Sequence, residues 1–202
     1  MERGEISTRE KIILAAVARI EKEGIDSVTI RSIALEAGVN IASINYYFGS
    51  KEKLLEETLG QTAKEAFADP IEMLEDINKD VRISLQAVFS HFLKGSHTYP
   101  GLSRAHVYGP LLRGDYSGVF VKEYLKFLDH LYKKIKPFFP GTDPKSLKSA
   151  IVQALSVIIF LGLLPGLNKD FLKTNIKDKQ IQEDFIRELI ERLFPAPEAP
   201  PD

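Results

Sequence analysis

The side chains best suited to recognising another molecule gather in one short stretch, residues 40–51. Ser43, Asn45 and Tyr46 carry groups that donate and accept hydrogen bonds, and Lys51 adds an ammonium group. Such side chains can contact the base edges and phosphates of DNA, while Ile and Ala side chains can meet thymine methyl groups. No acidic residue that would repel phosphate occurs in this stretch. Its composition is therefore typical of a DNA-contacting surface.

Two short helices and a tight turn must position these side chains. Thr29 can cap the first helix, whose apolar residues recur at helical spacing: Ile30, Ile33, Ala34 and Ala37. Gly38 ends this helix, because a left-handed backbone costs glycine less than other residues. Asn40 is placed to cap the second helix, which ends at Phe48 and buries it together with Ile44. A helix-turn-helix has this form, with its second helix lying in the DNA major groove.

The predicted DNA contacts are the helix caps, the outward side chains of the second helix and nearby cations: Thr29, Arg31, Asn40, Ile41, Ala42, Ser43, Asn45, Tyr46, Tyr47 and Lys51. Lys51 lies near the start of a third helix, where the helix dipole and the ammonium group both favour a phosphate. Each residue also has a plainer interpretation. The polar side chains could form a solvated surface, Thr29 could be a cap only, and Tyr47 could pack against the protein.

Small, aromatic and capping residues fall in register over roughly residues 7–55: Ala15, Ala16, Gly24, Thr29, Ile33, Ala34, Ala37, Gly38, Val39, Tyr46, Tyr47, Phe48, Ser50, Lys51, Glu52 and Leu54. In these positions the chain closely resembles the TetR family of bacterial transcriptional regulators. Ala42 and Asn45 stand where that family often has glycine and tyrosine, which leaves the base preference open. The resemblance implies a dimer that binds operator DNA and is released by a small-molecule effector.

The composition is that of an ordinary soluble globular protein, with 44% apolar and 27% charged residues in 202. The absence of cysteine excludes disulfides and thiolate metal sites, which suits a reducing cytoplasm. No apolar segment follows the first five residues, so we expect no signal peptide. These observations predict a cytoplasmic protein.

Net charge argues weakly against nucleic acid as a partner. The chain carries −1 overall, and counting residues 1–55 gives eight Lys and Arg against eight Asp and Glu. A strongly basic domain is the usual electrostatic sign of DNA binding. Any affinity must therefore come from the local arrangement of Arg31, Lys51 and Lys53, from helix N-termini and from doubling by dimerisation.

The spacing of apolar residues predicts an all-α chain. A first helix should begin at Ser7 or Thr8 and end at Gly24, and the later helices are expected at 51–68, 71–94, 103–108, 116–136, 145–164 and 178–194. Pro70 should end the helix that begins at Lys51, because proline disfavours helical geometry in the residue before it. We expect a DNA-binding domain at 1–50, a ligand-binding and dimerisation domain at 51–194, and a disordered tail at 195–202.

The last two long helices are expected to form a homodimer interface. Residues 149–164 carry no charge, but about 16 residues are too few for the roughly 20 that span a bilayer. We therefore exclude a membrane and expect a helix buried on every side, with a second subunit covering one side. The resemblance implies the same dimer, a four-helix interface. The predicted contacts are Val152, Leu155, Ile159, Phe185, Leu189 and Ile190.

Aromatic and polar residues between 89 and 127 suggest a small-molecule pocket. Such pockets are mostly apolar with a few polar groups that converge. The candidates are Phe89, Phe92, His106, Tyr108, Phe120, Tyr124 and Phe127. For any one of them an ordinary place in a helical core is the alternative. The aromatic content favours an apolar or aromatic effector.

Two other classes of protein fit parts of the sequence. The four histidines could bind a metal or act with a carboxylate in a helical enzyme, but their spacing is not that of a helical metal site. The sequence also lacks a nucleophile elbow and a phosphate-binding loop. A helical dimer that binds a small molecule or protein without DNA remains open, given the neutral N-terminal part. We expect no enzyme, metal or cofactor, but a ligand-responsive DNA-binding dimer that acts as a repressor.

Overall fold

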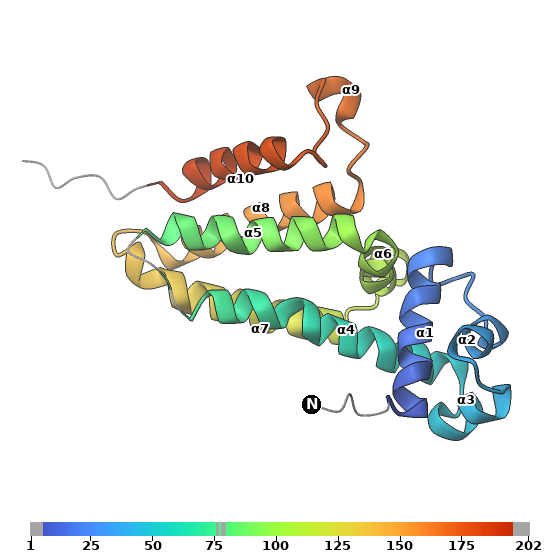
Figure 1. Cartoon of the computed structure of the whole chain (residues 1–202). Helices are drawn as coiled ribbons and strands as arrows, with labels where there is room; N and C mark the ends of the chain where they lie inside the picture. The colour runs from blue at the N-terminus through green and yellow to red at the C-terminus, as the bar shows by residue number, and fades with distance from the viewer. Residues whose placement is uncertain (1–5, 76, 78–79, 196–202) are drawn as a thin grey trace, which may run out of the picture. The chain divides into compact units, whose positions relative to one another are not determined.

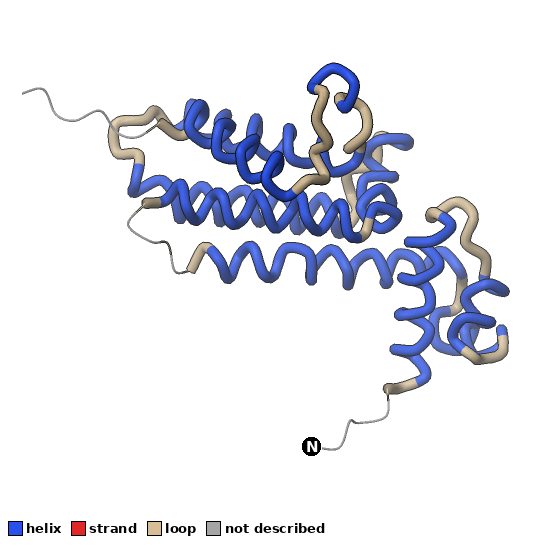
Figure 2. Tube along the Cα trace, turned by 45° about the horizontal axis from the view of Figure 1, so that its top comes forward, coloured by secondary structure: helices blue, strands red, loops and turns tan. Residues whose placement is uncertain are grey.

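The structure of the chain, a computed structural model, describes residues 6–75, 77 and 80–195. The regular elements in these ranges are all helices, which confirms the predicted all-α fold (Figures 1 and 2). They are α1 Thr8–Glu23, α2 Ile30–Ala37, α3 Ile41–Phe48, α4 Lys51–Met73, α5 Val81–Thr98, α6 Pro100–Tyr108, the π-helical turn η1 Gly109–Arg113, α7 Val119–Ile135, the 3-10 turn η2 Lys136–Phe138, α8 Pro144–Leu163, α9 Lys169–Leu172 and α10 Lys179–Leu193. The predicted tail lies outside the described residues from position 196 on.

The helices form two compact units. One consists of the described residues of Met1–Lys64 and Tyr99–Val121, and the other of those of Glu65–Thr98 and Lys122–Asp202. The segment that carries α6 therefore belongs to the first unit, although it follows α5 in the sequence. The domain boundary expected at residue 50 stays a prediction.

The first unit begins with the caps that the sequence predicts. The Ser7 hydroxyl accepts the N–H of Glu10 at 3.2 Å, and the Glu10 carboxylate accepts the N–H of Ser7 at 2.9 Å. This reciprocal capping box satisfies two amides at the start of α1. The core of the unit joins α1 to α4 with α6: Ile12, Ile13, Ala16, Ile20, Val28, Ile33, Ala34, Ile44, Phe48, Leu54, Leu102 and Ala105.

The N-terminus of α6 is held by α1. The Glu21 carboxylate accepts the N–H of Gly101 at 3.1 Å and the N–H of Leu102 at 2.9 Å. These amides have no partner inside a helix, and they lie at the positive end of its dipole, so a carboxylate suits them. Position 101 requires glycine, because a Cβ there would collide with the backbone of Glu21.

Helix α4 runs through Pro70, where the sequence analysis wrongly expected it to end. The helix continues to Met73 with Pro70 inside it. Proline removes one backbone hydrogen bond there, but Pro70 and Phe67 are both buried, and this packing offsets the loss close to the helix end. The helix expected at 71–94 is wrong at its start for the same reason, since α5 begins only at Val81.

The helix end expected at residue 94 is also placed wrongly. Helix α5 continues through Gly95 to Thr98. A glycine inside a helix costs only about 1 kcal/mol, which the burial of Leu93 and its neighbours outweighs. Pro100 starts α6 instead of ending a segment, because its fixed φ and missing N–H fit the first turn of a helix.

The second unit is built mainly from α5, α7, α8 and α10. Helix α8 packs on α5 and α10, and Figure 1 shows α5 and α8 running side by side. Aromatic rings fill the space near α7: the Phe67 ring lies 5.5 Å from Phe92 and 5.7 Å from Phe127, and Phe92 lies 5.1 Å from Phe127. These three rings and Tyr124, 6.5 Å from Phe67, form an aromatic cluster.

Helix α8 is not buried on every side within the chain. Its inner residues are Leu147, Ala150, Ile151, Ala154, Leu155, Ile158, Leu161 and Gly162, whereas Val152 and Phe160 are exposed. Among the described residues it is the one helix long and apolar enough to cross a membrane, by length and composition only. A single such helix is weak evidence for a membrane span, and 44% of its most apolar window is buried inside the protein.

Two glycines in the second unit give opposite expectations for stability. A Cβ at Gly162 would lie 2.6 Å from Cβ of Ser96, so Gly162→Ala should destabilise the α5–α8 contact by about 1–3 kcal/mol. A Cβ at Gly95 meets no atom within 4 Å, so Gly95→Ala should stabilise α5 by about 0.5–1 kcal/mol. Urea unfolding of both variants measures the changes. Equal effects of the two substitutions would contradict the close approach of α8 to α5.

Candidate nucleic-acid interface

The turn between α2 and α3 is fixed by its glycine. Gly38 adopts the left-handed conformation, with φ 66° and ψ 34°. The N–H of Val39 reaches back to the carbonyl of Ala34 at 3.0 Å, and the N–H of Gly38 bonds to Leu35 at 3.3 Å. This Schellman-type ending satisfies carbonyls that would otherwise lack partners, and it confirms Gly38 as the predicted end of the helix.

Both helices of the pair begin at the predicted caps. The Thr29 hydroxyl accepts the N–H of Ser32 at 3.0 Å, and the Ser32 hydroxyl accepts the N–H of Thr29 at 3.1 Å. The Asn40 side-chain oxygen accepts the N–H of Ser43 at 2.7 Å and the Ser43 hydroxyl at 3.0 Å. Asn40 therefore keeps its amide N–H groups for a partner, whereas Ser43 already donates its hydroxyl proton.

The inner side of α3 is anchored, and the outer side is exposed. Ile44 is fully buried and Phe48 is 6% exposed. The Arg9 guanidinium lies 5.2 Å from the centre of the Phe48 ring and pairs with Glu57 of α4. These contacts join α3 to α1 and α1 to α4, so the orientation of the short helix α3 is fixed by its neighbours. The role of Arg9 was not predicted.

The outer side of α3 is aromatic and polar. Tyr46 is 84% exposed, Tyr47 is 41% exposed, and their rings meet edge to face with centroids 5.1 Å apart. Ile41, Ala42 and Asn45 are also exposed. This distribution agrees with the predicted outward set except at Ser43, which is half-buried. Tyr47 packs on both Tyr46 and Phe48, so its alternative as a packing residue stays open.

The cations beside α3 are spread along the start of α4 and α2. The Ser50 hydroxyl accepts the N–H of Lys53 at 3.2 Å and so caps α4. Lys51 and Lys53 both lie in the first turn of that helix, where a phosphate would be favoured. Arg31 is exposed on α2. Leu35, 84% exposed on the same helix, is an apolar surface residue that the sequence analysis did not single out.

The residues predicted to bind an effector fall in different units. His106, Tyr108 and Phe120 belong to the first unit, and Phe89, Phe92, Tyr124 and Phe127 belong to the second. Phe89 and Phe127 are fully buried, and Phe89 packs on Phe194 rather than on the aromatic cluster. Their contact with a ligand stays a prediction.

His106 is the most perturbed titratable group in the described chain. Its Nε2 lies 3.3 Å from the hydroxyl of Thr62, and its ring stacks on Phe120 with centroids 5.4 Å apart and planes at 19°. Burial lowers the pKa of His106 from 6.5 to about 4. The imidazole is therefore neutral at physiological pH. The part of the chain that the structure describes holds no group of three or more His, Asp or Glu residues that could bind a metal.

The predicted dimer contacts differ in their accessibility. Val152 is 46% exposed, and Ile159, Phe185 and Leu189 are partly exposed, but Leu155 and Ile190 are only 2% exposed within the single chain. An open groove with a volume of about 550 Å³ lies beside the exposed residues of α8 and α10. It is lined by Ser156, Val157, Phe160, Leu161, Asn168, Phe171, Leu172 and Phe185.

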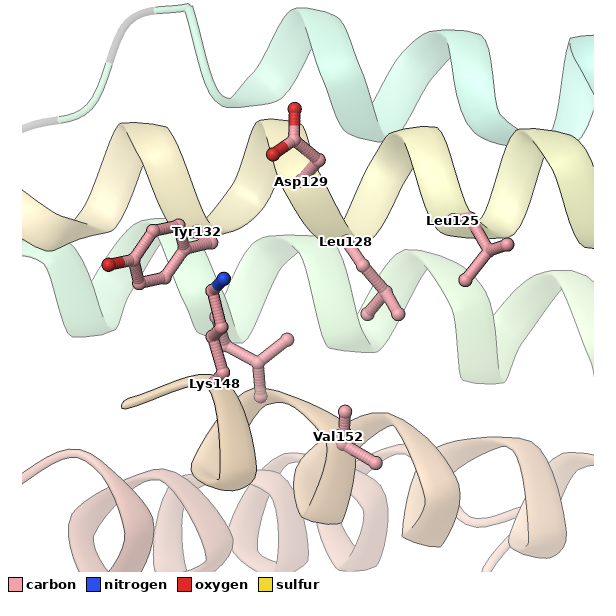
Figure 3. Close-up of a pocket in the computed structure, with 7 residues that line it drawn as sticks. Leu125, Leu128, Asp129, Tyr132, Lys148 and Val152 are labelled. Carbon is pink, nitrogen blue, oxygen red and sulfur yellow. The ribbon is translucent and has the colours of Figure 1, made fainter. Parts of the chain in front are cut away.

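A second hollow lies between α7 and α8 (Figure 3). Its volume is about 230 Å³, and it is lined by Leu125, Leu128, Asp129, Tyr132, Lys148, Ile151 and Val152. The Lys148 ammonium lies 4.8 Å from the centre of the Tyr132 ring, which closes one end of the hollow. None of these residues except Val152 was a predicted contact.

Helix α3 has eight residues, a capped start, an anchored inner side and a polar, aromatic outer side. These features define the class of the protein: it is a helix-turn-helix protein, and α3 is its recognition helix. Residues 12–58 match the family model described as bacterial regulatory proteins, tetR family. This segment is a helix-turn-helix of that family, which confirms the resemblance seen in the sequence. A segment of a family of regulatory proteins argues against the helical enzyme considered as an alternative.

Similar proteins support the assignment over different lengths. The HTH-type transcriptional regulator BetI of Vibrio vulnificus is 31% identical over 75 residues, which is 37% of this chain and only 38% of that relative. A TetR-family member from Streptomyces coelicolor is 25% identical with a TM-score of 0.66, over 95% of this chain and all of that one. The multidrug binding protein EbrR, complexed with imidazole, is 23% identical with a TM-score of 0.64, over 96% and 99% of the two chains.

The lowered pKa of His106 should appear in the pH dependence of folding. The folded protein keeps His106 neutral, while the unfolded chain takes up a proton below about pH 6.5. Its stabilising contribution is therefore present above pH 6.5 and is lost as the pH falls towards 4. Between pH 6.5 and 5 the wild type should lose about 1–2 kcal/mol more than a His106→Gln variant. Urea titrations at both pH values measure this, and parallel losses would contradict the burial of the ring.

Proposed function

We propose that the chain is a transcriptional regulator that binds operator DNA as a homodimer through α3. The observation that carries this proposal is the exposed outer side of α3, held rigidly from behind, inside the segment that matches the tetR family. Tyr46 and Asn45 would contact bases or sugars, and Lys51 and Arg31 would contact phosphates. The regulator would act in the cytoplasm, most simply as a repressor.

Local geometry compensates for the neutral charge of the N-terminal part. Three acidic side chains of the first unit are paired: Glu57 with Arg9, Glu23 with Arg19, and Glu21 with the amides of α6. Lys51, Lys53 and the N-terminus of α4 are concentrated next to α3. This arrangement offers phosphates a positive edge without a basic domain.

Dimerisation would supply the remaining affinity. Exposed apolar side chains on α8 and its neighbours, including Val152, Phe160 and Phe171, favour a second copy as their cover. Two helix-turn-helix units in a two-fold dimer contact half-sites about one DNA turn, or a multiple of it, apart, so the operator would be palindromic. A small molecule that changes this spacing would release the operator. The structural similarity to the multidrug binding protein EbrR supports a small-molecule effector.

A fluorescence-anisotropy titration tests the proposal as a whole. The purified protein would be titrated against the DNA that flanks its own gene, at two salt concentrations and with random DNA as competitor. Binding that survives the competitor and weakens with salt is the expected result. A dimer with no preference over random DNA, also after selection from a genomic library, would favour the alternative, a helical binding module without DNA.

Substitutions on the outer side of α3 should weaken operator binding without loss of folding. Tyr46→Ala should cost about 1–3 kcal/mol, and Lys51→Ala should lower the salt slope by about one. Tyr116→Ala and Lys64→Ala are matched controls, because both side chains are exposed in the first unit away from α3. Anisotropy at several salt concentrations separates the two effects. Operator binding that all four variants retain would contradict α3 as the recognition helix.

A charge on the outer side of α8 should weaken the dimer. Val152→Glu would bury a carboxylate at the proposed interface, so the dimer dissociation constant should rise by at least about tenfold. Sedimentation equilibrium measures this constant. Leu111→Glu, at a residue 72% exposed in η1, serves as the control and should leave it unchanged. A Val152→Glu variant that dimerises as tightly as the wild type would argue against this interface.

A further inference from the structure

Two ammonium groups approach the ring of Tyr132 on α7. The Lys148 ammonium lies 4.8 Å from the centre of this ring, and the Lys136 ammonium lies 5.9 Å from it. In the described part of the chain neither of these two lysines forms an ion pair with a carboxylate. The two like charges repel each other, because they lie within roughly one Debye length of each other. An anion bound next to both would offset this repulsion.

The hollow between α7 and α8 has this positive site at one end and apolar side chains at the other. Its volume is about 230 Å³. Figure 3 shows Tyr132 and Lys148 at one end, while Leu125, Leu128 and Val152 lie towards the other. Leu125 is 58% exposed and Val152 is 46% exposed, so both side chains keep apolar surface that a ligand can cover.

Asp129, the acidic residue of the hollow, does not neutralise the positive end. Its carboxylate pairs with the Lys133 ammonium at 2.6 Å. In Figure 3 the same carboxylate points away from the Lys148 ammonium. A bound anion would therefore meet Lys136 and Lys148 without competition from this carboxylate. The Tyr132 hydroxyl can donate a hydrogen bond to the same anion.

The two ends together restrict the kind of ligand. A carboxylate matches the ammonium groups in charge and accepts their hydrogen bonds. An alkyl or aryl body removes apolar surface from water when it lies against leucine and valine side chains. A neutral molecule would leave the repulsion between the ammonium groups in place, and a cation would add to it.

We propose that the hollow between α7 and α8 binds a small carboxylate with an alkyl or aryl body. The carboxylate lies next to the ammonium groups of Lys136 and Lys148, and the body covers Leu125, Leu128 and Val152. None of the residues predicted to bind an effector lines this hollow. The site is therefore distinct from the predicted effector pocket, and the inference does not rest on operator binding.

The test uses phenylbutyrate as the probe and methyl NMR of the full-length protein without DNA as the measurement. Phenylbutyrate should shift the methyl signals of Leu125, Leu128 and Val152. Phenylbutanol, which has the same body without the charge, should bind about fivefold more weakly. Acetate, which lacks the body, should not compete. Added salt should weaken the binding of phenylbutyrate but not that of phenylbutanol, because salt screens exposed charges.

A pair of lysine variants tests the positive end of the hollow. Lys148→Gln removes the charge and keeps much of the side-chain stem, so the affinity for phenylbutyrate should fall about twofold to fivefold. Lys145 is also exposed on α8 but does not line the hollow, so Lys145→Gln should leave the affinity unchanged. Both side chains are exposed, and both variants should remain folded, which circular dichroism checks.

Three results would overturn the proposed site. They are unshifted methyl signals of the hollow, phenylbutanol that binds as tightly as phenylbutyrate, and an equal loss of affinity in the two lysine variants. A hollow filled by a second copy of the chain would overturn it as well. That arrangement appears as NMR contacts between the Leu125 methyl groups and a differently labelled subunit, together with no binding of the probe.

Discussion

The recognition helix depends on the burial of two side chains. An isolated helix of eight residues is not stable in water, because the cost of nucleation exceeds what so few hydrogen bonds return. Helix α3 forms because Ile44 and Phe48 are buried against α1 and α4 while Asn40 and Gly49 close its ends. The same burial decides which side chains remain outside. The exposed side chains and the buried side chains of α3 are thus two results of one helical period.

Local rules predicted the N-terminal helices well and the later boundaries less well. Thr29, Gly38 and Asn40 act within a few residues of themselves, so their caps can be inferred from sequence alone. Pro70 and Gly95 disfavour a helix locally, but each lies among side chains buried by distant segments, and packing decided the outcome. The short helix α9 carries no periodic pattern and was missed. Its Phe171 is 88% exposed, so no burial marks it in the sequence either.

The residues of the candidate nucleic-acid interface show the same difference between what local sequence predicts and what distant segments decide. Exposure of Tyr46 and Asn45 could be inferred from their place opposite buried residues on one short helix. Pairings between distant segments could not, such as Arg9 on Phe48 or Thr62 with His106, because no local spacing records them. Leu155 and Ile190 show a related limit. An apolar stripe predicts that a side chain is buried, but not whether its own chain or a partner covers it.

The Glu21 carboxylate accepts the first amide N–H groups of α6, and this contact limits how the helix-turn-helix could be transferred to another protein. Leu102 and Ala105 of α6 complete the core around α1 and α2, and position 101 accepts only glycine. The DNA-binding part is therefore not a structural unit that is complete at residue 58, where the matched segment ends. A chimera that transplants this helix-turn-helix onto another body would have to carry Glu21 and the segment of α6 together, or lose part of its hydrophobic core.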